Sequence, residues 1–104
     1  MIIVTIDHIP GRNYEVLGVV KGNVVQSKNF GKDFMSAMKG LVGGEIVAYT
    51  EMLAEARQIA TGRMAKEAEA LGADAVLNLR YASSSVMQSA AECIAYGTAV
   101  RFVD

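Results

Sequence analysis

The stretch EALGADAVLNLRY (residues 69–81), together with the run AECIAYGTAV (residues 91–100), decides the fold of this chain. The first four residues of the stretch end a helix, and Gly72 stands where a glycine in the left-handed conformation closes one. The two longer runs have the composition of β-strands. Because the serine-rich segment 82–90 separates them, we predict an antiparallel pair joined by a wide hairpin.

A long helix precedes these strands, roughly from Glu45 to Leu71. Its apolar residues recur every three or four positions, which places them along one side of a helix. They are Tyr49, Met52, Leu53, Ala56, Ile59, Ala60, Met64, Ala68 and Leu71. Charged residues fall largely off this side, so we expect the helix to lie across one face of a sheet.

The N-terminal run Met1–Ile6 is short and rich in β-formers. Pro10–Gly11 follows it, a pair that suits the two central positions of a type II turn. Further along, Asp33 is a good N-cap for a short helix, Phe34–Leu41. We expect Met1–Ile6 to form a strand apart from the main sheet, free to reach a neighbouring subunit.

Tyr14–Val25 reads as a long, valine-rich strand. Simple alternation places Val16, Gly18, Val20 and Gly22 on one face of it. Two glycines on one face indicate either a close approach of another backbone or a β-bulge. We favour the close approach.

The elements combine into one α+β domain over residues 1–104. The predicted order is β-α-β-β, with an antiparallel sheet packed on one long helix, plus the short N-terminal strand and a short extra helix. A chain of 104 residues is the length of a single domain.

Composition favours self-association. The chain is 52% hydrophobic and 20% charged, with a mean hydropathy of +0.26, against about 45–50% and about 25% in average domains. A small monomer has little interior in which to bury this apolar excess. The most economical cover is a second copy of the same chain, so we expect a homo-oligomer.

Charge and targeting signals narrow the function classes. A net charge of −1 and a pI near 5.8 speak against a nucleic-acid partner. No run approaches the ~20 apolar residues of a membrane span, and Met1–Ile6 lacks the basic start of a signal peptide. The single cysteine, Cys93, fits a reducing compartment. We therefore expect a cytoplasmic protein without a membrane partner.

Metal-ligating residues are few. A structural zinc needs four Cys or His ligands, and this chain has one of each, His8 and Cys93. His8 with Asp7 forms either an ordinary turn pair or a partial metal site that another subunit completes; the ligand count favours the turn. Cys93 lies in an apolar run, so we expect a buried thiol that packs as a small hydrophobe rather than a ligand or nucleophile.

Two further places deserve consideration as ligand sites. Gly43–Gly44 opens the long helix, where free N–H groups can hold an anion, although an ordinary helix start explains it better. Arg80 lies in an apolar strand, and Glu92 lies on the next strand. We expect a cross-strand salt bridge between them, or alternatively a pocket at a subunit interface in which Arg80 meets an acidic ligand. No nucleophile stands beside a base, so the sequence predicts no enzyme and identifies no cofactor.

Several stretches together resemble the YbjQ family, which carries a heavy-metal-binding label. They are Ile9–Gly11, Gly31–Phe34, Val42–Glu45, Tyr49–Glu51, Ala56–Arg57, Leu71–Val76, Ala91–Glu92 and Tyr96–Val100. The resemblance covers nearly the whole chain and implies a dodecin-like β-α-β-β subunit in a ring of five. It leaves three hypotheses open: a ring-forming module that binds or stores a small molecule or ion, a metal-binding protein, and an enzyme with active sites between subunits.

Overall fold

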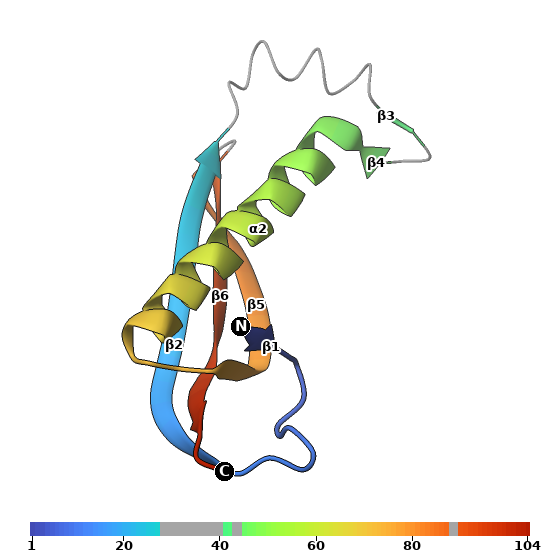
Figure 1. Cartoon of the computed structure of the whole chain (residues 1–104). Helices are drawn as coiled ribbons and strands as arrows, with labels where there is room; N and C mark the ends of the chain where they lie inside the picture. Colours follow the sequence, from blue (N-terminus) through green and yellow to red (C-terminus); the bar gives the residue numbers. More distant parts are fainter. Residues whose placement is uncertain (28–40, 43–44, 88–89) are drawn as a thin grey trace.

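The fold is α+β, with one long helix packed across a four-stranded mixed sheet (Figure 1). The computed structural model describes residues 1–27, 41–42, 45–87 and 90–104. Its elements are β1 (Ile2–Ile3), β2 (Tyr14–Ser27), β3 (Leu41–Val42), β4 (Glu45–Ile46), α2 (Val47–Ala70), β5 (Ala75–Met87) and β6 (Ala90–Phe102). The strand order in the main sheet is β1-β5-β6-β2. The predicted class and the β-α-β-β core are thereby confirmed.

The core lies between α2 and the face of the sheet made by β2 and β6. The helix residues that are buried recur every four positions: Met52, Ala56, Ala60, Met64 and Ala68. The four from Ala56 to Ala68 pack in one cluster with Val20 and Val24 of β2 and with Cys93, Ala95 and Ala99 of β6. Small residues predominate on both sides, and the predicted stripe faces the sheet, except for Leu71, which is 49% exposed.

Gly22 is where the helix and the sheet come closest. A Cβ atom at this position would lie 2.3 Å from the backbone nitrogen of Met64 and 2.4 Å from the carbonyl oxygen of Ala60. No side chain fits at such distances. The close approach predicted for Gly22 is confirmed.

Gly18 has a different role, because the register between β2 and β6 shifts between Val16 and Gly18. Gly18 has φ +136°, a conformation that residues with a Cβ rarely adopt. The extra residue of this bulge reverses the alternation of side chains. Val16 is therefore 67% exposed, while Leu17 packs against the core. The prediction that Val16 shares the face of Val20 was wrong.

The hairpin between β5 and β6 is tighter than the sequence suggested. The three serines lie within β5, where Ser83, Ser84 and Ser85 pair with Cys93, Glu92 and Ala91. The expected wide hairpin was therefore wrong. A strand ladder joins main-chain groups, and exposed serine side chains do not interrupt it.

The N-terminal run joins the sheet of its own chain. Ile2 and Ile3 of β1 pair in parallel with Ala75 and Val76 of β5. The sheet is consequently mixed rather than wholly antiparallel. Hydrogen bonds from the Val4 N–H to the Val76 carbonyl and from the Leu79 N–H to the Val4 carbonyl, both 3.0 Å, continue the contact.

β5 changes character after this contact. Its register with β6 shifts between Leu77 and Arg80, where Asn78 takes φ +56°. Before the shift β5 is buried between β1 and β6, and after it the strand is exposed. In the part of the chain that the structure describes, no strand covers the outer edge of β5 from Arg80 to Met87.

The ends of α2 differ in how well the sequence predicted them. Gly72 has φ +80°, and the Ala73 N–H donates to the Ala68 carbonyl at 3.0 Å, so the predicted glycine cap is confirmed. At the other end Glu45–Ile46 pairs with Leu41–Val42 as β4 and β3, and the helix begins two residues later than predicted. The predicted short helix falls on residues 34–40, outside the described residues, and on Leu41, which belongs to β3 instead.

Candidate functional site

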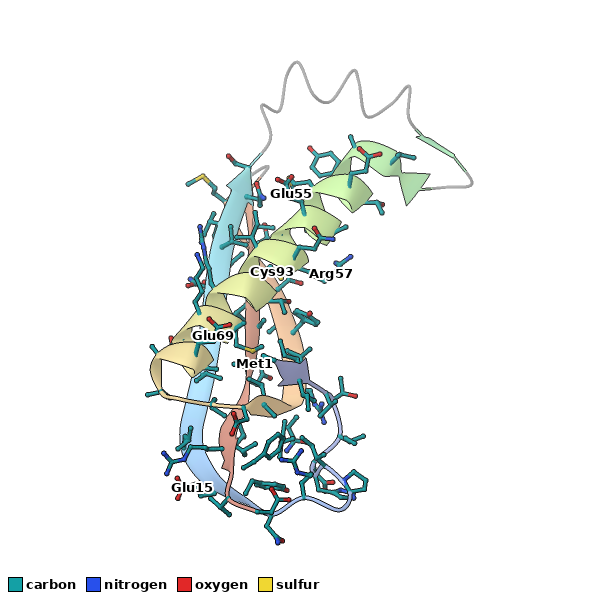
Figure 2. The ribbon with its side chains drawn as sticks, in the orientation of Figure 1. Met1, Glu15, Glu55, Arg57, Glu69 and Cys93 are labelled. Carbon is teal, nitrogen blue, oxygen red and sulfur yellow. The ribbon has the colours of Figure 1, made fainter. Side chains whose placement is uncertain are left out.

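The predicted metal residues do not form a site within one subunit. His8 Nδ1 lies 2.7 Å from Asp7 Oδ1, and both side chains are exposed, 63% and 79%. This hydrogen bond and the adjacent imidazole lower the pKa of the Asp7 carboxyl. Cys93 is elsewhere, beneath α2 (Figure 2). Among residues 1–27, 41–42, 45–87 and 90–104 no three His, Cys, Asp or Glu side chains gather as metal ligands.

The predicted salt bridge between Arg80 and Glu92 was wrong. Strand register places Arg80 opposite Tyr96 and Glu92 opposite Ser84, so the two charges are not cross-strand partners. The Arg80 guanidinium instead donates to the carbonyl oxygens of Thr5 and Leu79, at 3.1 and 2.8 Å. The Glu92 carboxylate accepts from the Asn23 amide at 3.2 Å. The anion site considered at Gly43–Gly44 lies outside the described residues.

A groove that sequence reasoning missed runs between α2 and the second half of β5. Its outer hollow, of about 520 Å³, is lined by Ala54, Arg57, Gln58, Thr61, Gly62 and Tyr81. Its inner hollow, of about 160 Å³, is lined by Leu53, Arg57, Tyr81, Ala82, Ser83 and Cys93. Both hollows share Arg57 and Tyr81, so these two side chains stand at the junction. Figure 2 shows Arg57 on the side of α2 that faces β5.

Cys93 forms part of the inner hollow. Its side chain is only 3% exposed and packs in the cluster beneath α2, as predicted for a buried thiol. Alternation along β6 explains the orientation, because Cys93, Ala95 and Ala99 all face the helix. Cys93 is thus both a core residue and a wall of the groove.

The hydroxyl groups at the junction form a directed chain. Thr61 Oγ1 donates to the Arg57 carbonyl at 2.7 Å, an i to i−4 bond within the helix, and lies 2.7 Å from the Tyr81 hydroxyl. A hydroxyl has one hydrogen to donate. Since that of Thr61 is directed at the carbonyl, Tyr81 is the donor to Thr61. The Tyr81 oxygen then offers the groove lone pairs rather than a hydrogen.

Arg57 differs from the other four arginines, all of which the structure describes. The guanidinium groups of Arg12 and Arg101 each contact a carboxylate, and those of Arg63 and Arg80 donate to carbonyls. Within the described part of the chain, no partner contacts the guanidinium of Arg57. It is an unpaired cation that lines a concave surface.

Among the described residues that line the groove there is no histidine, aspartate or glutamate that could act as a general base. The single histidine, His8, lies in the loop after β1, away from the hydroxyls and the thiol of the groove. One signal could have located the groove from sequence: Arg57 and Thr61 stand one helical turn apart, off the apolar stripe. The position of Tyr81 opposite them depends on the bulge after Leu77, which the sequence did not reveal.

Comparison with known proteins gives a consistent family. Residues 1–103 match the YbjQ_1 family model, described as "Putative heavy-metal-binding". A UPF0145 protein of Clostridium novyi is 59% identical over 99% of this chain and 100% of its own length. A UPF0145 protein of Thermotoga maritima is 62% identical over 97% and 96%.

A solved structure supports the fold. The chain is similar to a protein of unknown function from Pediococcus pentosaceus, of the DUF74 family, with a TM-score of 0.67 and 19% identity. The match covers 99% of this chain and 98% of the other. Because the family model matches residues 1–103 and the relatives are similar over their whole length, this chain belongs to the YbjQ (UPF0145) family.

Proposed function

We propose that the protein is a ring-forming homo-oligomer that binds a small molecule in the groove between α2 and β5. The observation that carries the binding part of this proposal is the Arg57 guanidinium, which has no partner among the described residues and stands at the junction of two hollows. A cation in a concave site, next to an apolar recess, is the arrangement of a small-molecule pocket. The net charge of −1 favours such a ligand over nucleic acid.

The unpaired edges of the sheet support assembly. β2 is an outer strand of 14 residues, and in the described part of the chain no strand pairs with its outer edge. The sheet face opposite α2 carries apolar residues, among them Val19 at 72% and Val25 at 56% exposure. Open edges and apolar faces of this kind pair with other chains.

The dimensions of the chain point in the same direction. Its radius of gyration is 17.1 Å, whereas a compact domain of about 100 residues has one of about 13 Å. A subunit that is elongated when alone gains buried surface when it packs beside copies of itself. Five copies is the number that the family resemblance implies.

Light scattering during size exclusion at micromolar concentration tests the assembly. We expect a single species at a multiple of the 11.1 kDa subunit mass, and five subunits is the expected multiple. A species at 11.1 kDa would refute the proposal, and another closed ring would refute only the number. Native mass spectrometry of the same sample tests whether a small organic molecule is retained.

Metal binding is a second candidate, which the family description and the exposed Asp7–His8 pair favour. The pair supplies two ligands per subunit, so neighbouring copies would have to complete the coordination. Equilibrium dialysis against Zn²⁺ tests this candidate, with His8→Ala as the variant that removes one ligand. The single cysteine cannot form a disulfide within one chain, which favours a reducing compartment such as the cytoplasm.

A helix that spans a membrane is not found among the described residues.

A further inference from the structure

We propose that the groove binds a short-chain monocarboxylate, with its carboxylate on Arg57 and its apolar chain in the inner hollow. The inference deepens the proposed function, since it names the ligand class of the same groove. The described residues that line both hollows belong to one subunit, so the ligand assignment can be tested separately from the ring.

The charge of the groove selects a monoanion. Arg57 is the single charged side chain among the described residues that line the two hollows. A ligand with one negative charge neutralises it, whereas a cationic ligand would meet an unopposed positive charge. The planar guanidinium fork also matches the two oxygens of a carboxylate, which it can hold with two parallel hydrogen bonds.

The donor count favours a carboxylate over a phosphate. Phosphate groups bind where several N–H and O–H donors converge on them. Here the hydrogen of Tyr81 is directed at Thr61, and the hydrogen of Thr61 at the Arg57 carbonyl. Arg57 is left as the charged donor at the junction, and the Gln58 amide and the Ser83 hydroxyl are the remaining neutral side-chain donors among the described lining residues. One guanidinium fork with few neutral donors suits two carboxylate oxygens better than a phosphate dianion.

The inner hollow indicates the polarity and the size of the ligand beyond its carboxylate. Leu53, Ala82 and Cys93 give it apolar walls, and its volume of about 160 Å³ limits the occupant to a few carbon atoms. The wider hollow beside Gln58 and Gly62 is more open to water. A ligand with its carboxylate at the junction therefore buries its chain in the inner hollow, against the Cys93 side chain.

Calorimetric titration of the full-length protein with butyrate tests this assignment, with butylammonium and inorganic phosphate as comparison probes. We expect saturable binding of butyrate and at least ~10-fold weaker binding of both other probes. Arg57→Gln should weaken butyrate by ~10-fold or more, because it removes the charge and the fork. Lys66→Gln, which removes a positive charge from the exposed side of the same helix, should change affinity by less than ~2-fold.

Equal binding of butylammonium or phosphate, or unchanged butyrate affinity in Arg57→Gln, would overturn the ligand class. A second readout does not depend on affinity. Butyrate in the inner hollow should slow the reaction of Cys93 with a thiol reagent in the wild-type protein, and it should have no effect in Arg57→Gln. An unprotected Cys93 in the presence of saturating butyrate would place the ligand elsewhere and refute the pose.

Light scattering on the same samples separates this inference from the proposed assembly. Arg57→Gln should retain the oligomeric mass of the wild type. A monomeric Arg57→Gln that also fails to bind butyrate would mean that Arg57 contacts a second copy, and the ligand assignment would be wrong. A wild-type monomer that binds butyrate would refute the ring and leave the carboxylate site standing.

Discussion

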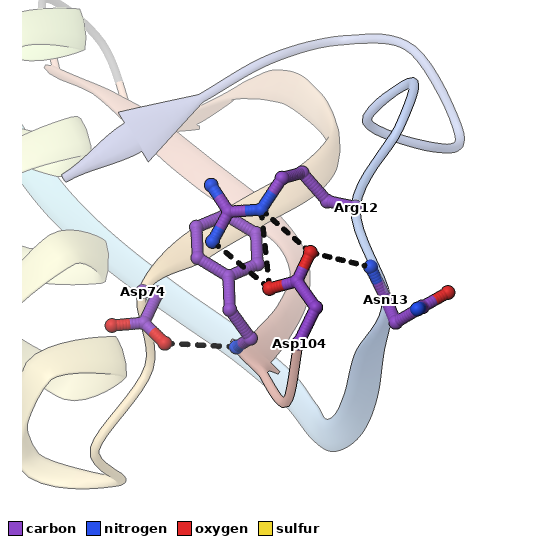
Figure 3. Close-up of polar contacts among 5 residues, drawn as sticks. Arg12, Asn13, Asp74 and Asp104 are labelled. Atoms are coloured by element: carbon purple, nitrogen blue, oxygen red, sulfur yellow. Dashed lines mark hydrogen bonds and ion pairs between the residues drawn. The ribbon is translucent and has the colours of Figure 1, made fainter.

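Arg12, at one end of the sheet, and Arg57, beside the middle of β5, have opposite surroundings. At one end Arg12 contacts Asp104 through Nε and Oδ2 at 3.0 Å, and its guanidinium lies 3.7 Å above the Phe102 ring (Figure 3). Asp74 accepts the Phe102 N–H at 2.8 Å. We call Arg12, Asp74, Phe102 and Asp104 the clamp. At the groove, Arg57 has no such partner within the part of the chain that the structure describes.

The difference separates a structural role from a binding role. The clamp joins the start of β2 to the end of β6. Its Arg12 guanidinium donates hydrogen bonds to the Asp104 carboxylate and lies over the Phe102 ring. The Arg57 guanidinium lines two hollows instead. The pairing of Arg12 within the fold explains its position by stability, whereas the position of Arg57 in a concave site is the basis of the binding role proposed for it.

A comparison of the tightly packed core with the open groove predicts the largest change in stability, at two glycines. Gly22→Ala should destabilise the protein by about 3 kcal/mol or more, because the new methyl group meets the backbone of Met64 and Ala60. Gly62→Ala is the matched control in the groove, where a Cβ has nothing within 4 Å. Helix propensity should make it more stable by about 0.5–1 kcal/mol. Urea unfolding of both variants measures whether the free energy of unfolding falls in Gly22→Ala and rises in Gly62→Ala. A loss of stability in Gly62→Ala would mean that the groove is not open.

Cys93 lies on the boundary between the core and the groove, and its substitution has a smaller effect. Cys93→Ser should cost about 1–3 kcal/mol, because it places a hydroxyl among apolar side chains. Cys93→Ala should cost less, since it leaves only a small cavity. Thermal melts of the two variants compare them. A serine variant as stable as the alanine variant would show that the inner hollow is wet.

The clamp should give a pH-dependent effect that is smaller still. The hydrogen bond from Arg12 lowers the pKa of the Asp104 carboxyl below the value usual for aspartate. A lowered folded-state pKa stabilises the fold above the unfolded pKa, and this contribution is lost as pH falls. Asp104→Asn should therefore melt at a lower temperature than wild type at pH 7, and the difference should shrink below about pH 4. A difference that is constant across this range would contradict the assignment.

Removal of metal should have the smallest effect. Among the described residues of one subunit, no group larger than the Asp7–His8 pair comes together as metal ligands, so we expect no folding dependence on a metal ion. Dialysis against a strong chelator should leave the melting temperature unchanged. A large fall would instead indicate a site completed between subunits, and would favour the metal-binding candidate over the groove.

Sequence reasoning predicted the parts of the fold that depend on local pattern. The four-residue repeat of α2, the cap at Gly72, the turn at Pro10–Gly11, and the close approach at Gly22 follow from spacing and residue type. The turn is confirmed by φ +76° at Gly11 and by the Arg12 N–H to Ile9 carbonyl bond, 3.3 Å.

The side-chain orientations that depend on β-bulges could not be predicted from local pattern. The shift at Gly18 exposed Val16, and the shift after Leu77 separated Arg80 from Glu92. Neither shift has a signature in alternation, because one extra residue reverses every side chain beyond it. The groove was missed for the same reason, since Tyr81 faces Thr61 only after the second shift.

The long outer edge of β2 also has a consequence for how the protein is made in the cell. In the part of the chain that the structure describes, no strand pairs with the outer edge of β2, which is 14 residues long and rich in valine. In the homo-oligomer proposed above, this edge stays open on a newly synthesised chain until a second copy covers it. Such edges also template misassembly and aggregation, which compete with correct assembly. The proposed assembly requires chains to meet, so its rate rises more steeply than in direct proportion to chain concentration. The rate of synthesis would then influence the yield of the proposed oligomer. Lys21, exposed in the middle of this strand, is a charge of the kind that discourages wrong pairing during that interval.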